Sequence, residues 1–308
     1  PDFRTDIQTK DSDPGNVPFQ CGENSVAVFI IGASGLIGGE LHKKCSALDH
    51  AVIGACTSNK NNGNLVYLDL CSNHIDDFCD KIGSEDTVFI MSAYSNPSWI
   101  YENKAKATEL NLTGTKRLID RLAPKMPHLV FMSSVEIFDG QKGGYKENDA
   151  GNPLNYYGQM KLDIEHHLKQ NYDRHTIVRT GWNIGNDIKS RCVVSLTYET
   201  LLKSGAKMAD DNYFSVIAAS DTAEALSRLI DRDEIKIIHI ASDAIIGRTY
   251  LANKIITESI SGDKMKFDVC RFADIKYTEA RGRVNDLDNT RSKELLGMTY
   301  LSADAVIS

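Results

Sequence analysis

Residues 26–38 have the sequence VAVFIIGASGLIG, an apolar run that ends in three glycines spaced Gly-x-x-Gly-x-x-Gly. The apolar part is short and β-rich, as expected of a strand buried on both faces of a parallel sheet. Gly32 permits a tight turn after the strand, Gly35 lets the backbone approach a pyrophosphate, and Gly38 lets a helix pack closely on the strand. Because a helix N-terminus attracts anions, the stretch predicts a cradle for a dinucleotide.

Strand-like and helix-like segments alternate after this glycine loop. Strands are expected at residues 26–31, 51–55, 65–68, 87–91, 129–132, 176–179 and 235–240, and helices at 36–48, 73–82, 98–122, 155–170, 221–231 and 289–296. The alternation is typical of an α/β protein with a Rossmann-type doubly wound parallel sheet. The pattern loosens after about residue 182.

Three parts of the chain are therefore expected. Residues 1–24 are polar and form an N-terminal extension, and residues 25–182 form the main part of an NAD(P)-binding Rossmann domain. Residues 183–308 form mostly a smaller C-terminal α/β lobe that binds substrate, with some segments returning to the Rossmann sheet.

The composition is that of an ordinary globular protein: 308 residues, 42% hydrophobic and 25% charged. A net charge of −7 argues against a nucleic-acid or acidic-membrane partner, although a local site can still take a phosphorylated ligand. The seven cysteines include no Cys-x-x-Cys and are expected as reduced thiols, with no metal site. No apolar run approaches the ~20 residues that span a membrane, so a cytoplasmic protein is expected.

Three further residues carry the chemistry that the glycine loop suggests. Tyr157 and Lys161 are four residues apart, which places them on one face of the expected helix at 155–170. The Lys161 ammonium can lower the pKa of the phenol and hold a nicotinamide ribose, while the phenol exchanges a proton with the substrate oxygen. Ser134, at the end of the preceding strand, can hydrogen-bond the same oxygen. The combination predicts hydride transfer to or from a carbon that bears oxygen.

The stretch after the second expected strand bears on the cofactor. An acid there would bond the ribose hydroxyls of NAD, but residues 56–60 read CTSNK and contain none. Hydroxyls, an amide and a lysine suit a 2′-phosphate better, so NADP(H) is favoured and NAD(H) stays open. Asp69, after the third strand, either accepts from the adenine amino group or caps a helix.

These motifs resemble those of the extended short-chain dehydrogenase/reductase family, from about residue 26 to residue 297. Within that family the chain is most similar to dTDP-4-dehydrorhamnose reductases. Residues 133–140, SSVEIFDG, resemble their Ser-Thr-Asp-Tyr-Val-Phe-Asp-Gly, and residues 152–162, NPLNYYGQMKL, resemble their Pro-x-Asn-x-Tyr-Gly-x-x-Lys-Leu. Residues 178–182, VRTGW, resemble the segment after their sixth strand.

The resemblance implies an NAD(P)H-dependent reductase of a nucleoside-diphosphate 4-keto-(deoxy)sugar, with Tyr157 as proton donor. It also implies a homodimer, and it matches Asn111 to the family's asparagine that supports the active-site helix. Three departures leave the sugar open: Ser134 stands for Thr, Val135-Glu136 for Asp-Tyr, and Arg281-Gly282 for Arg-Pro.

Two other readings stay open. Related dehydratases and decarboxylases carry a glutamate at the position of Glu136, so an epimerase, decarboxylase or dehydratase that retains NAD is the second hypothesis. The regulatory subunits of methionine adenosyltransferase also resemble these reductases, so a non-catalytic NADP-binding subunit is the third.

The expected site has three groups of residues. The catalytic residues are Ser134, Tyr157 and Lys161. The expected cofactor contacts are Gly32, Ser34, Gly35, Leu36, Ile37, Gly38, Thr57, Ser58, Asn59, Asp69, Leu70, Ser92, Ala93, Tyr94, Asn111, Ser133, Tyr157 and Lys161. The expected substrate contacts are Ser95, Ser134, Val135, Glu136, Tyr157, Trp182, Asn183, Arg248 and Arg281.

Overall fold

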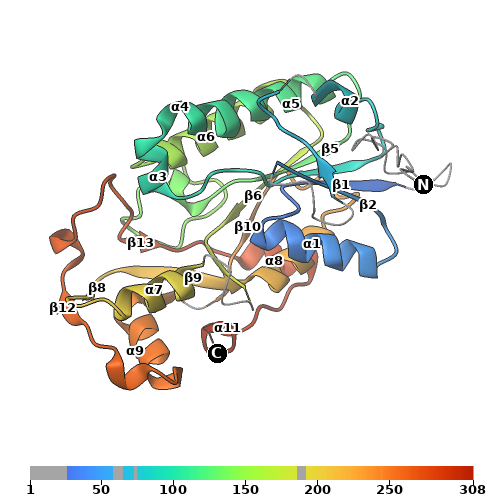
Figure 1. The fold of residues 1–308 in the computed structure, drawn as a ribbon. Coiled ribbons are helices and arrows are strands. Elements are labelled where there is room, and N and C mark those ends of the chain that lie inside the picture. Colours follow the sequence, from blue (N-terminus) through green and yellow to red (C-terminus); the bar gives the residue numbers. More distant parts are fainter. Residues whose placement is uncertain (1–25, 58–64, 73–74, 186–191, 244, 308) are drawn as a thin grey trace, which may run out of the picture.

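The computed structural model describes residues 26–57, 65–72, 75–185, 192–243 and 245–307 (Figure 1). Its main sheet has the order β10-β6-β5-β4-β1-β2-β3, and every neighbouring pair is parallel. The strands are β1 (Ala27–Ile31), β2 (Ala51–Cys56), β3 (Val66–Tyr67), β4 (Thr87–Ile90), β5 (His128–Met132), β6 (His175–Thr180) and β10 (Ile237–Ile240). The strand order reverses between β1 and β4, which confirms the expected doubly wound sheet.

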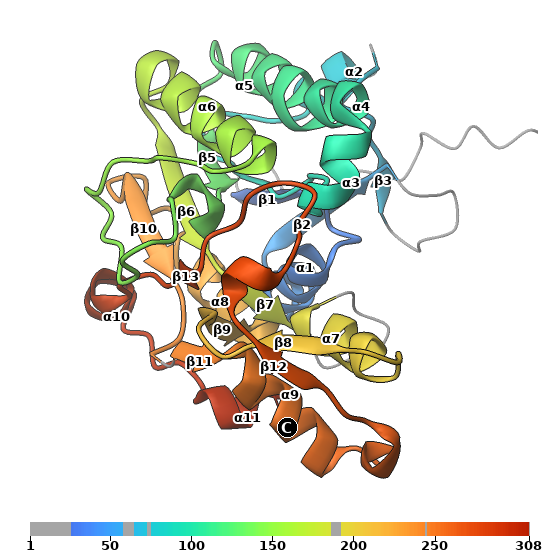
Figure 2. The same cartoon turned by 90° about the vertical axis from the view of Figure 1, so that its left-hand side faces the viewer.

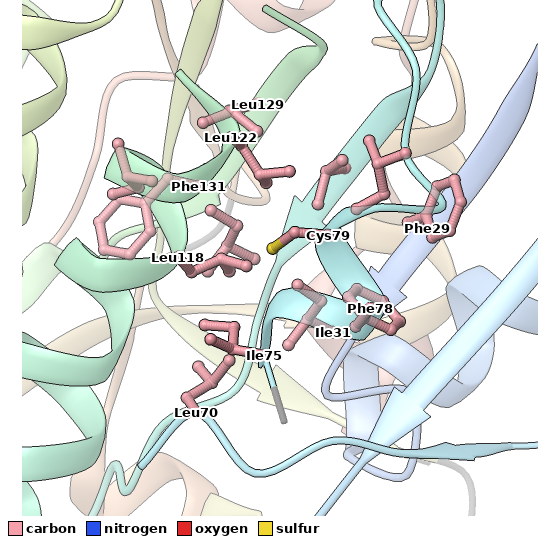
Figure 3. Close-up of a cluster of buried hydrophobic side chains, with 14 of the residues drawn as sticks. Phe29, Ile31, Leu70, Ile75, Phe78, Cys79, Leu118, Leu122, Leu129 and Phe131 are labelled. Carbon is pink, nitrogen blue, oxygen red and sulfur yellow. The ribbon is translucent and has the colours of Figure 1, made fainter. Parts of the chain in front are cut away.

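Helices cover both faces of this sheet. On one face lie α2 (Ile75–Cys79), α5 (Thr115–Leu122) and α6 (Tyr156–Asn171); on the other lie α1 (Leu36–Ala47) and α8 (Ala219–Ser227) (Figure 1). Successive residues of β1 point to opposite faces, as in any strand. Phe29 and Ile31 join the buried cluster under α2 and α5, where Phe78 packs edge-on against Phe29 (Figure 3). Val28 and Ile30 join the cluster under α1 and α8.

The prediction of a single helix at 98–122 is wrong, because the structure divides this range into four segments. The structure has α3 (Pro97–Glu102), α4 (Lys104–Thr108), a π-helical segment η1 (Glu109–Gly114) and then α5. Asn103 leaves helical geometry between α3 and α4, and its side chain donates to the Trp99 carbonyl at 2.9 Å. This side-chain bond to the backbone competes with regular helix formation. The helix expected at 221–231 is α8 in the structure, which begins at Ala219 and ends at Ser227, earlier than predicted at both ends.

A smaller lobe lies beyond the carboxyl ends of the main strands (Figure 2). Its sheet joins β7 (Trp182–Ile184), β9 (Tyr213–Ala218), β11 (Ile245–Gly247) and β13 (Val284–Asn285), and β8 (Lys207–Ala209) pairs with β12 (Asp268–Cys270). Its helices are α7 (Val193–Leu201), α9 (Arg248–Glu258) and α11 (Ala303–Ile307), while α10 (Thr290–Leu296) contacts β10. The division of the chain at residues 182–183 stays a prediction. No helix in the described part of the chain is long and apolar enough to cross a membrane.

Candidate active site

A cleft of about 350 Å³ lies at the carboxyl ends of β1, β4, β5 and β6, where the strand order reverses. Ligands of doubly wound sheets bind at this edge because adjacent loops diverge there. The glycine loop forms one wall and the N-terminal turn of α6 another. Trp182, Asn183 and the first residues of α7 line the side toward the lobe.

The glycine loop has the geometry of a phosphate cradle. Gly32 has a φ of +100°, in the region that favours glycine, and its backbone turns directly out of β1. A Cβ on Gly38 would lie 2.2 Å from the Gly32 carbonyl oxygen, so α1 begins in close contact with the loop. The helix N-cap is Gly35, and no side chain caps it. The first amides of α1 therefore fit the pyrophosphate of a dinucleotide.

Ser134, Tyr157 and Lys161 meet on the wall opposite the glycine loop, and all three line the cleft. Each is less than a tenth exposed. The Lys161 ammonium donates to the Met132 carbonyl at 2.6 Å and lies 5.8 Å from the centre of the Tyr157 ring. Tyr157 and Lys161 lie on one face of α6, and Ser134 follows the end of β5. The fold thus brings together three residues that lie up to 27 positions apart in the sequence (161 minus 134).

The protonation of this set differs from the sequence-based expectation. Burial, followed by the nearby Glu136 carboxyl, raises the pKa of Tyr157, and a hydrogen bond with Ser134 only partly opposes the rise. Burial also lowers the pKa of Lys161 to about 8, against the attraction of Glu165. The Lys161 ammonium is directed at a carbonyl, and desolvation outweighs any lowering of the phenol pKa. The Tyr157 phenol is therefore protonated at neutral pH.

Glu136 is held beside Tyr157 by close backbone packing. It belongs to the 3₁₀ turn η2 (Val135–Ile137), whose N-cap is Ser134. A Cβ on Gly158 would lie 2.0 Å from the Glu136 carbonyl oxygen, so the turn and α6 touch directly. One Glu136 carboxyl oxygen accepts from the Asn155 amide at 2.7 Å. Burial raises the pKa of Glu136, while Asn155 and Arg281 oppose the rise.

The structure brings most of the expected contacts to the cleft and leaves others away from its lining. The lining includes Gly32, Gly35, Leu36, Ile37, Gly38, Ala93, Ser95, Ser133, Val135, Glu136, Trp182, Asn183 and Arg281. It does not include Ser34, Thr57, Asp69, Leu70, Ser92, Tyr94, Asn111 or Arg248. Asp69 instead accepts from the Cys71 amide at 2.9 Å, and Leu70 is fully buried in the core. Ser58 and Asn59 lie outside the described residues.

Asn111 supports the cleft from behind. It lies in η1, where its amide donates to the Tyr94 carbonyl at 2.8 Å and its oxygen accepts from the Tyr94 N–H at 2.9 Å. The neighbours of Tyr94, Ala93 and Ser95, line the cleft. A π-helical turn is a frequent feature of functional sites. Here it presents the asparagine that fixes the loop after β4, and the expected support of α6 by Asn111 stays a prediction.

We expect Asn111→Leu to lower the free energy of unfolding by about 2 kcal/mol, because the N–H and carbonyl of Tyr94 lose their partners. Urea denaturation followed by circular dichroism measures the change. Thr113→Ala is the matched control, since Thr113 is an exposed residue of the same π-helical segment. Equal stability of Asn111→Leu and Thr113→Ala would contradict the clamp.

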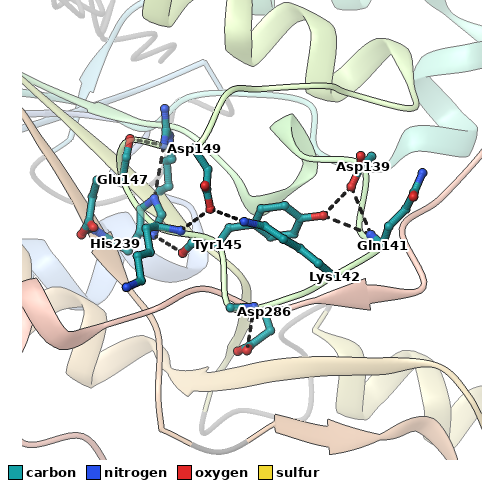
Figure 4. Close-up of polar contacts among 11 residues, drawn as sticks. Asp139, Gln141, Lys142, Tyr145, Glu147, Asp149, His239 and Asp286 are labelled. Carbon is teal, nitrogen blue, oxygen red and sulfur yellow. Dashed lines mark hydrogen bonds and ion pairs between the residues drawn. The ribbon is translucent and has the colours of Figure 1, made fainter.

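A polar network runs from the partly exposed loop between β5 and α6 to the buried Arg179 and His239, and the sequence pattern did not predict it. The loop between β5 and α6 is held by Tyr145, which bonds Asp139, and by Asp149, which accepts from the Lys142 ammonium at 2.8 Å (Figure 4). His239 of β10 contacts the Tyr145 carbonyl at 3.0 Å (Figure 4). Arg179 joins this network to α6. A charged residue directly after the apolar pair Ile177-Val178, inside β6, was the signal available in the sequence.

The doubly wound sheet, the glycine cradle and the Ser–Tyr–Lys set define a dinucleotide-binding protein of the short-chain dehydrogenase/reductase type. The chain belongs to the RmlD substrate binding domain family, whose model matches residues 26–302. Among the described residues, no group of three or more histidine, cysteine or acidic side chains is placed to hold a metal ion.

Similar proteins include reductases and a subunit of methionine adenosyltransferase. The chain is 26% identical over 179 residues to dTDP-4-dehydrorhamnose reductase of Mycobacterium tuberculosis, covering 56% of this chain and 59% of that enzyme. It is 27% identical over 155 residues to methionine adenosyltransferase 2 subunit beta of Xenopus tropicalis, covering 49% of this chain and 45% of the relative. The match thus spans about half the length of these relatives.

A solved structure matches over nearly the whole chain. It is the crystal structure of a hypothetical dTDP-4-dehydrorhamnose reductase from Sulfolobus tokodaii, which is 28% identical with a TM-score of 0.76. The alignment covers 91% of this chain and 98% of that chain.

Proposed function

We propose that the protein reduces the ketone of a nucleoside-diphosphate 4-keto-(deoxy)sugar with NADPH. The observation that carries the proposal is the meeting of Ser134, Tyr157 and Lys161 in one cleft with the glycine cradle. The nicotinamide supplies the hydride when it is bound. Tyr157, neutral and buried, gives its proton to the carbonyl oxygen as negative charge develops there. Ser134 donates to the same oxygen.

The choice of NADPH rests on the acid-free stretch after β2, and NADH stays the alternative. The choice of a phosphorylated sugar rests on two arginines. The Arg248 guanidinium lies 4.6 Å from the ring centre of Phe214 and 5.7 Å from that of Trp182, which lines the cleft. The Arg281 guanidinium lies 5.1 Å from the Tyr277 ring centre.

Neither arginine has an ion-pair partner among the described residues, and the Nε of Arg281 is buried without a hydrogen-bond partner there. Burial lowers the pKa of Arg248 to about 10, so it stays charged at neutral pH. Two guanidinium groups held against aromatic rings fit a diphosphate, because each presents several donors to anionic oxygens.

Arg248→Met should raise KM for the nucleotide sugar by roughly 10- to 100-fold, the cost of losing hydrogen bonds to a charged group. The Kd for NADPH should change less than threefold. Arg271→Met is the control, because Arg271 is an exposed arginine of the same lobe that pairs with Asp210 at 2.9 Å. Steady-state kinetics and fluorescence titration measure the two constants. Equal KM values for the two variants would argue against the diphosphate contact.

The direct test follows the loss of absorbance of NADPH or NADH with a panel of nucleoside-diphosphate 4-keto-sugars. Turnover with one sugar supports the reductase and identifies the cofactor. Glu136 favours a second candidate, a redox-neutral enzyme, because a carboxyl beside Tyr157 can take a proton from a carbon next to the ketone. That candidate predicts NAD retained through purification with no net consumption. Binding of NADPH with no turnover of any kind would favour the third hypothesis, a non-catalytic NADP-binding subunit; the chain is similar to methionine adenosyltransferase 2 subunit beta of Xenopus tropicalis.

A further inference from the structure

Three buried charged groups lie side by side behind the catalytic face. Lys161 and Glu165 are one turn apart on α6, and Arg179 is on β6. Their exposed fractions are 6%, 0% and 2%. The reaction proposed above uses Lys161 but assigns nothing to the other two. Charges are seldom fully buried unless they are paired, so the arrangement needs an explanation.

Glu165 is fixed by donors from three directions. Arg179 donates to both carboxyl oxygens, from Nε at 3.0 Å and from Nη2 at 2.7 Å. The Ser133 hydroxyl donates to Oε1 at 2.6 Å, and the Lys169 ammonium lies 3.4 Å from Oε2. Lys161 makes no bond to Glu165 and donates instead to Met132. The carboxylate and Lys161 are thus one helical turn apart on α6, and each is bonded to other partners.

We propose that Glu165 is a positioning residue that holds Lys161 in its charged form, with Arg179 and Ser133 keeping the carboxylate in place. The proposal rests on the proposed function, which places Lys161 with Tyr157 and Ser134 in the reacting cleft. Desolvation favours the neutral amine, and the field of Glu165 opposes it. Arg179 and Ser133 in turn keep Glu165 ionised: they lower its pKa although burial raises it.

Other groups around Lys161 do not replace this effect. From α6 it faces the Tyr157 phenol, and from β5 the Phe131 ring at 4.7 Å. Glu136 in η2 acts on Tyr157 rather than on Lys161. His239 of β10 contacts Arg179 at 3.3 Å, and burial lowers its pKa to about 4, so it is neutral. Lys169 is 36% exposed and is screened by water.

Breaking the same ion pair from its two sides should give opposite results. Glu165→Gln leaves Arg179 as a second buried cation, so the pKa of Lys161 falls and its charge is lost at lower pH. Arg179→Met removes the counter-charge of the carboxylate, while Ser133 and Lys169 still bond it and keep it ionised near pH 8. The pKa of Lys161 therefore rises, and its charge survives to higher pH. We expect shifts of about one pH unit in each direction, the usual scale for a nearby buried charge.

The experiment measures kcat/KM for ketone reduction against pH, together with the Kd for NADPH by fluorescence at each pH. The wild-type alkaline limb should fall near pH 8, move down in Glu165→Gln and move up in Arg179→Met. Lys169→Gln is the control and should move the limb by less than about 0.3 unit, because exposed pairs are weak. Limbs that coincide in all variants, with only the amplitude reduced, would overturn the proposal and leave Glu165 a structural residue.

A double variant and a binding measurement test the proposal if a single variant does not fold or if the wild type shows no turnover. If a single variant does not fold, Glu165→Gln/Arg179→Met replaces the pair by uncharged groups, a change that buried pairs often tolerate. Its limb should lie between those of Glu165→Gln and the wild type, and an unshifted limb would again overturn the proposal. If the wild type shows no turnover, the proposed function fails, and the pH dependence of the NADPH Kd still tests the role of Glu165.

Discussion

Tyr157→Phe should lower kcat for ketone reduction by roughly 10²- to 10⁴-fold, the usual contribution of a positioned general acid. In the proposed reaction the phenol is the proton donor; it is buried on the cleft wall, and burial raises its pKa, so the proton is present across the neutral range. The ring remains in the variant, so the cleft keeps its shape. The Kd for NADPH should therefore change little. Single-turnover reduction followed by absorbance separates the chemical step from binding.

Tyr156→Phe is the matched control for this prediction. Tyr156 is the preceding residue of α6, but its hydroxyl lies 2.8 Å from the Thr108 hydroxyl, and Tyr156 does not line the cleft. Its loss should leave kcat within about twofold, because no reacting atom is involved. If Tyr157→Phe kept more than a tenth of the wild-type kcat, another group would have to supply the proton.

Gly38→Ala should abolish measurable NADPH binding and lower the free energy of unfolding by about 3 kcal/mol, as overpacking of a tight contact does. The added methyl would lie 2.2 Å from the Gly32 carbonyl oxygen, which is backbone and cannot rotate away. Helix α1 must then move from the loop, and the amides that face the pyrophosphate move with it. Thermal unfolding and fluorescence titration measure both effects.

Gly39→Ala tests whether the losses in Gly38→Ala come from the close contact at residue 38 or from the replacement of any glycine in α1. Gly39 is the next residue of α1, and its added methyl would meet the Ala33 carbonyl oxygen at 3.5 Å, an ordinary contact. Alanine also favours the helix by about 1 kcal/mol over glycine. This variant should therefore be as stable as the wild type or more stable, with unchanged NADPH binding. Similar losses in both variants would show that close approach at Gly38 is not the reason for its glycine.

The parts of the fold that local patterns encode were predictable. An apolar run followed by glycines predicts a buried strand and a tight turn. A Tyr–Lys pair four residues apart predicts two side chains on one helix face. Both patterns lie within a few neighbouring residues. The broken helix at 98–122 was not predictable in the same way. Its π-helical turn meets the rest of the chain at Gly114, where a Cβ would lie 2.8 Å from the Leu70 carbonyl. Such a contact depends on residues far apart in the sequence.

The residues of the candidate site also differ in whether local sequence patterns predict them. Ser134, Tyr157 and Lys161 were predictable because their chemistry is carried by residue type and spacing. Glu165 was not, because on the sequence it is one acid among 42 Asp and Glu residues. Its importance appears only when β6 places Arg179 against it. Burial also reversed the expected direction of the Tyr157 pKa, since desolvation depends on the packed surroundings and not on the neighbouring lysine alone.

The place of β10 at the edge of the main sheet has a consequence for how the chain is made. β6 ends at Thr180, but the strand that pairs with it begins at Ile237, after β7, α7, β8, β9 and α8 have been synthesised. A nascent chain that has emerged only through β6 presents an uncovered parallel edge, the kind that recruits other strands. Because domains fold as their segments leave the ribosome at about 5–20 residues per second, this edge stays open for several seconds. The chain is therefore most vulnerable to aggregation during that interval, and a chaperone that shields the edge would act there.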